Sequence, residues 1–145
     1  MFSHFLKEDL FFPDLNIKSK EEILEFLTNK MIKLGYINRN IKNSILEREK
    51  ISSTAVGNMV AIPHPILPNK EKSLICTAIL KNEVQWSSSE NVILVFIIIL
   101  EQNIHSEFQA IFTSFYDMIY KEENVIRLAK QMNFDDFLRT INSIQ

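Results

Sequence analysis

The chain has 145 residues, of which 46% are hydrophobic and 23% are charged, and its formal net charge is −2. These values are typical of an ordinary globular protein, and they exclude an intrinsically disordered chain. No cluster of lysine and arginine side chains stands out that would neutralise nucleic-acid phosphates, so direct nucleic-acid contact by this domain is not expected. We take residues 1–145 as a single domain.

The sequence favours a reducing, cytoplasmic setting. Cys76 is the only cysteine and lies within an apolar run, which excludes an internal disulfide and predicts a buried thiol. The first residues lack the basic and apolar segments of a signal peptide. The longest apolar run, 92–100, is far shorter than the roughly 20 residues that a membrane-spanning helix needs. We therefore expect a cytoplasmic domain with no membrane insertion.

The first third of the chain predicts an edge strand followed by two helices. Residues 11–17 favour a strand that contains Pro13. Ser19 is followed three residues later by Glu22, a capping box that predicts a helix start, and Gly35 supplies the stop. The apolar stripe of this helix comprises Ile23, Phe26, Leu27, Met31 and Leu34. A second helix is expected over 39–49, with Asn38 as its cap.

The remainder of the chain predicts three strands and then three helices. From Ser52 onward the sequence consists of β-branched and apolar runs broken by proline, glycine and asparagine. Strands are indicated at 59–62, 74–80 and 92–100. The last strand shows no polar alternation, which is typical of a strand covered on both faces. Helical patterns follow at 104–119, 125–132 and 134–141. The sequence thus predicts an α/β three-layer sandwich in which a small mixed sheet has helices on both faces.

His64 is the residue most suited to chemistry. It lies between Pro63 and Pro65 at the end of the apolar run 59–62, and the prolines confine its backbone. A neutral imidazole aimed in this way can attack a phosphoryl group with one nitrogen while a hydrogen bond fixes the proton on the other. Spacing alone leaves open the alternative that His64 is an ordinary turn residue at the end of a strand.

Arg48 and His105 are the two further candidates for this site. Arg48 ends the second predicted helix, and His105 stands near the start of the helix after the long buried strand. A guanidinium and a second imidazole would neutralise the oxygens of a phosphoryl group, which is most of what phosphoryl transfer requires of a protein. By position alone, an arginine such as Arg48 is more often a solvated helix-end cation, and a histidine such as His105 is more often a surface or helix-capping residue.

The segment from Glu47-Arg48-Glu49 through Ser53-Thr54 and Gly57-Asn58 to Ala61-Ile62-Pro63-His64 resembles a family signature. It is similar to that of the enzyme IIA domains (type 2, the fructose/mannitol/nitrogen class) of the bacterial sugar phosphotransferase system. The resemblance extends over nearly the whole chain. It implies that His64 matches the phosphorylated histidine, Arg48 the active-site arginine and His105 the second histidine.

The resemblance also implies partners and a choice between two roles. The phosphate donor would be the phosphocarrier protein HPr. Sugar-transporting members usually carry glycine where this chain has Met59 and Pro65, whereas the Ile-Pro-His-Pro form looks more like IIA-like domains of transcriptional regulators and antiterminators. We therefore expect a regulatory phospho-acceptor module that acts on a phosphotransferase-regulation domain, with further parts of a longer protein preceding Met1.

The alternative is a stand-alone phosphotransferase component, a phosphohistidine carrier that relays phosphate to an enzyme IIB domain during sugar uptake. No cofactor is implied by either role. No metal site is expected, because Arg48 would oppose a cation and the carboxylates lack a recognised ligand spacing. The sequence names neither the sugar nor the oligomeric state.

Overall fold

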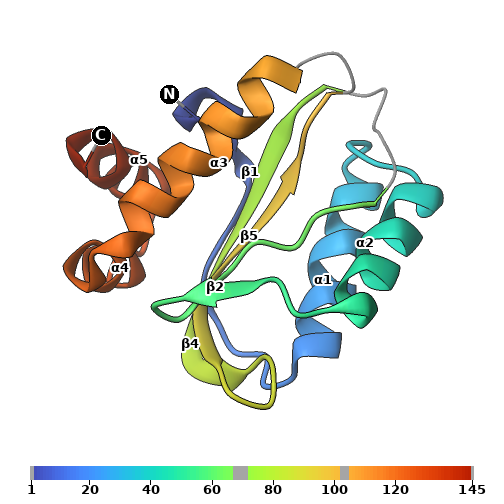
Figure 1. The fold of residues 1–145 in the computed structure, drawn as a ribbon, viewed down its shortest axis with the longest axis horizontal. Coiled ribbons are helices and arrows are strands. Elements are labelled where there is room, and N and C mark those ends of the chain that lie inside the picture. Colours follow the sequence, from blue (N-terminus) through green and yellow to red (C-terminus); the bar gives the residue numbers. More distant parts are fainter. Residues whose placement is uncertain (1, 67–71, 102–104, 145) are drawn as a thin grey trace.

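The computed structural model describes residues 2–66, 72–101 and 105–144, and within these ranges five strands form a single sheet. The strands are β1 (Leu6–Leu15), β2 (Ala55–Gly57), β3 (Val60–Ala61), β4 (Leu74–Gln85) and β5 (Asn91–Ile99). The helices are α1 (Lys20–Lys33), α2 (Arg39–Ile51), α3 (His105–Tyr120), α4 (Glu122–Ala129) and α5 (Phe134–Ile144), with a short 3₁₀ helix at Ser3–Phe5. Helices α1 and α2 cover one face of the sheet and α3 to α5 the other (Figure 1), which confirms the predicted three-layer α/β sandwich.

The sheet is mixed and runs in the order β1-β4-β5-β3-β2. Strands β1 and β4 are parallel, β4 and β5 antiparallel, and β3 and β5 parallel, while β2 and β3 form an antiparallel hairpin. The short β3 is therefore held beside the central β5, and the chain that leaves β3 continues alongside β5. This arrangement fixes the direction in which the segment that carries His64 enters the space next to α2.

Strand β5 supplies apolar side chains to both layers of the core, as its sequence predicted. Successive side chains of a strand point to opposite faces. Val95, Ile97 and Ile99 belong to the cluster beneath α1 and α2, and Leu94, Phe96 and Ile98 belong to the cluster beneath α3 to α5. All six are buried, and each contributes about 1.5 to 3 kcal/mol by burial.

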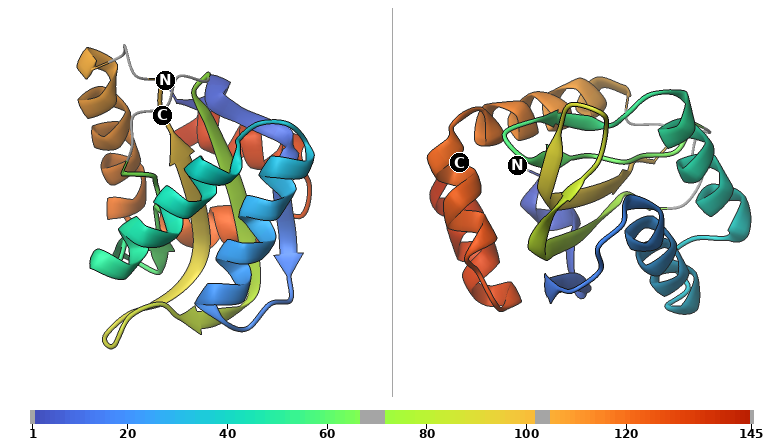
Figure 2. Two further views of the ribbon diagram at one scale, coloured as in Figure 1. Left: turned by 90° about the vertical axis from the view of Figure 1, so that its right-hand side faces the viewer. Right: turned by 90° about the horizontal axis from the view of Figure 1, so that it is seen from below.

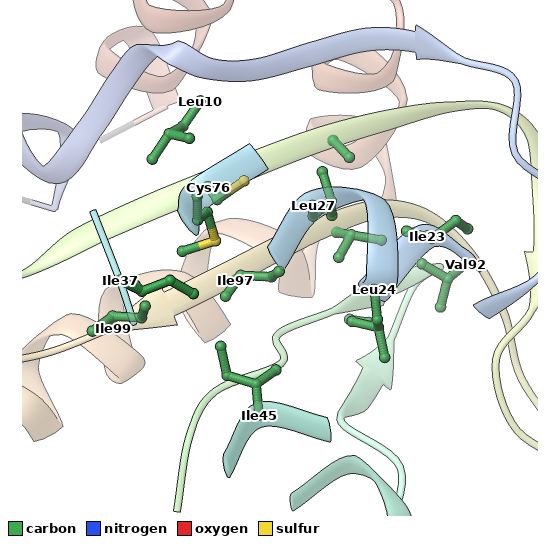
Figure 3. Close-up of a cluster of buried hydrophobic side chains, with 14 of the residues drawn as sticks. Leu10, Ile23, Leu24, Leu27, Ile37, Ile45, Cys76, Val92, Ile97 and Ile99 are labelled. Carbon is green, nitrogen blue, oxygen red and sulfur yellow. The ribbon is translucent and has the colours of Figure 1, made fainter. Parts of the chain in front are cut away.

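Helices α1 and α2 begin at the caps that the sequence predicted. The Ser19 hydroxyl accepts from the Glu22 amide at 3.2 Å, and the Asn38 side chain accepts from the Ile41 amide at 2.9 Å. Figure 3 shows Leu27 of α1 and Ile45 of α2 gathered with Cys76 and Ile97 of the sheet. Cys76 is buried as predicted.

Gly35 ends α1 at φ 82°, a left-handed conformation that suits glycine. Leu34 departs from the prediction, since it caps the end of α1 and its side chain is 46% exposed instead of joining the apolar stripe. None of the helices within the described ranges is long and apolar enough to cross a bilayer.

The strands differ from the prediction mainly at their ends. β1 begins at Leu6, five residues earlier than expected, and its pairing with β4 has register shifts. β2 was not predicted, because it is only three residues long and half-buried. β4 continues to Gln85 through exposed polar residues that form one arm of the β4–β5 hairpin. Ile104, expected at the start of the following helix, lies outside the described residues.

The β2–β3 hairpin reaches across to the end of α3, and Figures 1 and 2 show it extending toward that helix layer. Its two turn residues, Asn58 and Met59, have φ angles of 49° and 66°, as a tight hairpin turn requires. The Asn58 amide donates to the carbonyls of Ile119 and Tyr120 at 2.6 and 2.9 Å, and thereby caps α3. Met59 adopts this conformation at a cost of roughly 1–2 kcal/mol relative to glycine.

Candidate functional site

The backbone on either side of His64 is held by contacts to both the sheet and α2. The Pro63 carbonyl accepts from the Ile98 amide of β5 at 2.9 Å. Two residues after His64, the Ile66 amide donates to the Ser44 hydroxyl of α2 at 2.7 Å. Because Pro63 and Pro65 restrict the chain between these two anchors, the imidazole leaves a backbone with few alternative conformations.

The His64 ring is oriented by a hydrogen bond within its own segment. Its Nδ1 lies 2.8 Å from the Ile62 carbonyl oxygen. A carbonyl oxygen only accepts, so Nδ1 carries the proton and donates, and in the neutral ring the lone pair then lies on Nε2. The ring of Phe112, from α3, meets the imidazole edge-on at 5.9 Å between centroids and 79° between planes. The imidazole is thus fixed in tautomer by the sheet side and covered in part by α3.

The pKa of His64 is lowered from its ordinary value, first because burial disfavours the charged imidazolium. The positive charge of Arg48 lowers the pKa further, while the hydrogen bond to Ile62 and the negative charge of Glu49 raise it. The net effect favours the neutral imidazole, the form with a lone pair for attack. Sequence reasoning placed this pKa near 6.5 if unperturbed, and the structure moves it downward.

Arg48 lies in the last turn of α2 and is partly exposed. One guanidinium nitrogen donates to the Ser52 carbonyl at 2.8 Å and contacts the Ser52 hydroxyl at 3.3 Å. This bond closes the end of α2, and the guanidinium lies near enough to His64 to depress its pKa. The structure therefore brings two of the three sequence-predicted residues, Arg48 and His64, close enough for the charge of one to act on the other.

His105 is the first residue of α3, in agreement with its expected place at a helix start. Its side chain lies outside the part of the chain that the structure describes. Within that part, no three His, Cys, Asp or Glu side chains are grouped in a way that would hold a metal ion.

The burial of Glu49, which belongs to the signature segment, is a feature of this neighbourhood that the sequence did not reveal. Glu49 directly follows Arg48 but points inward, with only 6% of its surface exposed. Its carboxylate accepts from the amide and hydroxyl of Thr54 and pairs with Lys20 at 3.0 Å. A glutamate in a helix is usually solvated, so burial is not expected from its type. The available signal was Lys20 at the first position of α1, where the helix dipole disfavours a cation unless an anion lies nearby.

Comparison with known proteins adds sequence relatives of two kinds. The chain is 34% identical over 110 residues to the "Probable licABCH operon regulator" of Bacillus subtilis, which covers 76% of this chain and 17% of that protein. It is 28% identical over 131 residues to the mannitol-specific phosphotransferase enzyme IIA component of the same organism, covering 88% of this chain and 90% of the relative. The chain therefore spans about a sixth of the regulator and nearly all of the mannitol protein.

Solved structures share the fold. The chain superimposes with a TM-score of 0.80 on enzyme IIA of the mannitol system of Escherichia coli, solved in complex with phosphorylated enzyme IIB, at 23% identity and covering 95% of this chain and 99% of that one. It superimposes with a TM-score of 0.85 on the nitrogen regulatory protein IIA-Ntr of Neisseria meningitidis, at 16% identity and covering 97% and 98%. The family model "Phosphoenolpyruvate-dependent sugar phosphotransferase system, EIIA 2" matches residues 4–144. The chain belongs to this family of type-2 enzyme IIA domains.

Proposed function

We propose that this domain, comprising residues 1–145, accepts a phosphoryl group on Nε2 of His64 from the phosphocarrier protein HPr. The observation that carries the proposal is the 2.8 Å contact between Nδ1 of His64 and the Ile62 carbonyl, which assigns the lone pair to Nε2. In the transfer, this lone pair attacks phosphorus, the bond from phosphorus to the donor nitrogen breaks, and the donor nitrogen keeps the electron pair. The depressed pKa of His64 keeps the acceptor neutral at physiological pH.

Arg48 and His105 are proposed to stabilise the phosphoryl group during this step. Phosphoryl transfer depends chiefly on positioning the reactants and on neutralising the oxygens of the phosphoryl group in the transition state. The Arg48 guanidinium carries a permanent charge beside His64, and it would exchange or share its contact with Ser52 for a phosphoryl oxygen. His105 is included on the family resemblance and on its place at the first residue of α3.

We propose that the domain works in the cytoplasm as the regulatory IIA-like module of a transcriptional regulator or antiterminator. The similarity to the licABCH operon regulator, together with 26% identity over 129 residues to the transcriptional regulator ManR of B. subtilis, favours this role. Pro65 and Met59 agree with it. The partner would then be a phosphotransferase-regulation domain, whose contacts change when negative charge appears on His64.

A second role, relay of phosphate to an enzyme IIB domain, is favoured by a different observation. The mannitol enzyme IIA of B. subtilis aligns over 90% of its own length with this chain, so the domain also has the size of a stand-alone carrier. The fold it shares with E. coli enzyme IIA, solved with phosphorylated enzyme IIB, fits the same role.

The proposed function predicts that His64 alone takes up the stable phosphoryl group. The domain and its His64→Ala variant are incubated with phosphoenolpyruvate, enzyme I and HPr, and their intact masses are compared. One phosphoryl group should appear on the native protein and none on the variant. Acid-labile phosphate that persists on His64→Ala contradicts the assignment.

Titrating the phosphorylated and unphosphorylated forms against each partner class separates the two roles. Phosphorylation-dependent binding to a regulation domain, with poor transfer to enzyme IIB, supports the regulatory module. Rapid stoichiometric transfer to enzyme IIB, without such binding, assigns the domain to sugar uptake.

A further inference from the structure

Glu49 holds together the chain segments that converge on the phosphoryl acceptor. Its Oε2 accepts from the Thr54 amide at 2.8 Å, and its Oε1 accepts from the Thr54 hydroxyl at 2.5 Å. Lys20 of α1 pairs with Oε2 at 3.0 Å. A carboxylate that is 4% exposed loses most of its hydration, and these three donors replace it. Glu49 is thereby fixed in position at the end of α2.

The same residue is connected to His64 by two further hydrogen bonds. The Thr54 carbonyl accepts from the Ile62 amide at 3.0 Å. The Ile62 carbonyl in turn accepts from Nδ1 of His64 at 2.8 Å. Ile62 therefore contacts the loop after α2 through its amide and the catalytic candidate through its carbonyl. A continuous path of short contacts leads from the buried carboxylate to the nitrogen that sets the tautomer of His64.

Lys20 supplies the positive charge that pairs with the buried Glu49 carboxylate. It is the first residue of α1, where the helix dipole is unfavourable for a cation, yet its ammonium is held by Glu49 and by the Trp86 carbonyl at 3.1 Å. The groove between α1 and α2 around this pair is also lined by Glu21, Glu25 and Lys50. Within the described residues, the charged groups that act on His64 are Arg48 and Glu49 of α2, and α3 contributes the neutral ring of Phe112.

We propose that Glu49 is a positioning residue for phosphoryl transfer, and that through Thr54 it fixes the Ile62 peptide whose carbonyl holds Nδ1 of His64. This inference rests on the proposed function, in which Nε2 of His64 is the acceptor atom. Glu49 itself touches neither the donor nor the phosphoryl group. Its effect on the reaction passes through the orientation and tautomer of the imidazole and through the electrostatic field at the ring.

The test compares Glu49→Gln with Glu25→Gln, which is a matched control. Glu25 of α1 likewise forms an ion pair between the two helices, with the largely buried Lys42 of α2 at 2.6 Å, although the Glu25 side chain is 54% exposed. Among the described residues, none of its contacts leads to His64. Glu49→Gln should slow phosphoryl acceptance from phosphorylated HPr by about tenfold or more, the factor that one charge-assisted hydrogen bond represents. Glu25→Gln should leave the transfer rate unchanged.

Two readouts separate positioning from a merely structural role. The negative charge of Glu49 raises the pKa of His64, so Glu49→Gln should move the acidic limb of the rate–pH profile to lower pH. ¹⁵N NMR of the histidine side chains should show a larger population of the other tautomer, with the proton on Nε2. Thr54→Val removes the hydroxyl contact but keeps the negative charge of Glu49, so it should change the tautomer population while lowering the pKa of His64 less than Glu49→Gln does.

Each outcome decides the matter. A folded Glu49→Gln protein with the native tautomer, transfer rate and pH profile overturns the inference. If that variant does not fold, a native tautomer population in folded Thr54→Val overturns it instead. Phosphate that persists on His64→Ala is the failure of the proposed function, whereas the NMR readout requires no phosphoryl donor and tests the inference separately.

Discussion

The two helix layers contact the His64 segment in different ways. From the α1–α2 side come polar contacts, since Ser44 holds Ile66, and Arg48 and Glu49 hold the loop that follows α2. From the α3 side, within the described residues, the ring of Phe112 makes a T-shaped contact with the imidazole. Among these contacts, the α1–α2 layer thus determines where the backbone and the Arg48 charge lie, whereas Phe112 of the α3 layer determines how far water reaches the imidazole. A change in one layer should therefore leave a different experimental signature from a change in the other.

Arg48→Ala, a change in the α1–α2 layer, should slow phosphoryl transfer more than Phe112→Ala, a change in the α3 layer. Loss of a charge-assisted contact to the phosphoryl group is expected to slow acceptance by about tenfold to a hundredfold. Its bond to the exposed Ser52 carbonyl contributes little to folding, so the free energy of unfolding should fall by about 1 kcal/mol or less. Stopped-flow transfer from phosphorylated HPr and urea unfolding measure the two quantities.

Lys50→Ala is the matched control for Arg48, because Lys50 is an exposed cation in the same turn of α2. Its transfer rate should equal that of the native protein. Equal transfer by Arg48→Ala and the native protein, or unfolding of Arg48→Ala, would remove Arg48 from the site and weaken the contrast between the layers.

Phe112→Ala should produce the smaller effect, a change in pH dependence. Burial lowers the pKa of His64, and removal of the ring admits water, so the pKa should rise toward its ordinary value of about 6.5. The acidic limb of phosphoryl acceptance should then move to higher pH, and NMR titration of the His64 ring should show the same direction. Phe112→Leu keeps most of the apolar cover and should lie close to the native protein.

The same pKa shift has a signature in stability. Because the folded pKa is depressed, the unfolded chain binds more protons below about pH 6.5, and the stability contributed by neutral His64 is lost as the pH falls through the folded pKa. This dependence should flatten in Phe112→Ala. We expect Glu49→Gln to lower the pKa of His64 and Phe112→Ala to raise it. A rise on Glu49→Gln together with no change on Phe112→Ala would contradict the roles assigned to the two layers.

The sequence predicted the elements whose signals are local. The caps at Ser19 and Asn38, the stop at Gly35 and the unbroken apolar run of β5 each depend on residues within one helix or strand. The confinement of His64 by two prolines is local in the same sense, and it pointed to the candidate site before the fold was known.

The missed features depend on contacts between distant segments. β2 is only three residues long and exists because it pairs with β3 across a two-residue turn. The burial of Glu49 requires Lys20, 29 positions earlier, and Thr54, five positions later. The tautomer of His64 depends on the direction of the Ile62 carbonyl, which β3 sets by pairing with β5. Residue types alone do not encode these directions.

The most direct test of the account is to identify the nitrogen of His64 that carries phosphorus. Phosphorylation of ¹⁵N-labelled protein by phosphoenolpyruvate, enzyme I and HPr, followed by ¹⁵N and ³¹P NMR, distinguishes the two ring positions. The hydrogen bond from Nδ1 to the Ile62 carbonyl predicts that phosphorus is bonded to Nε2 and that Nδ1 remains protonated. A phosphoryl group on Nδ1 would contradict the account.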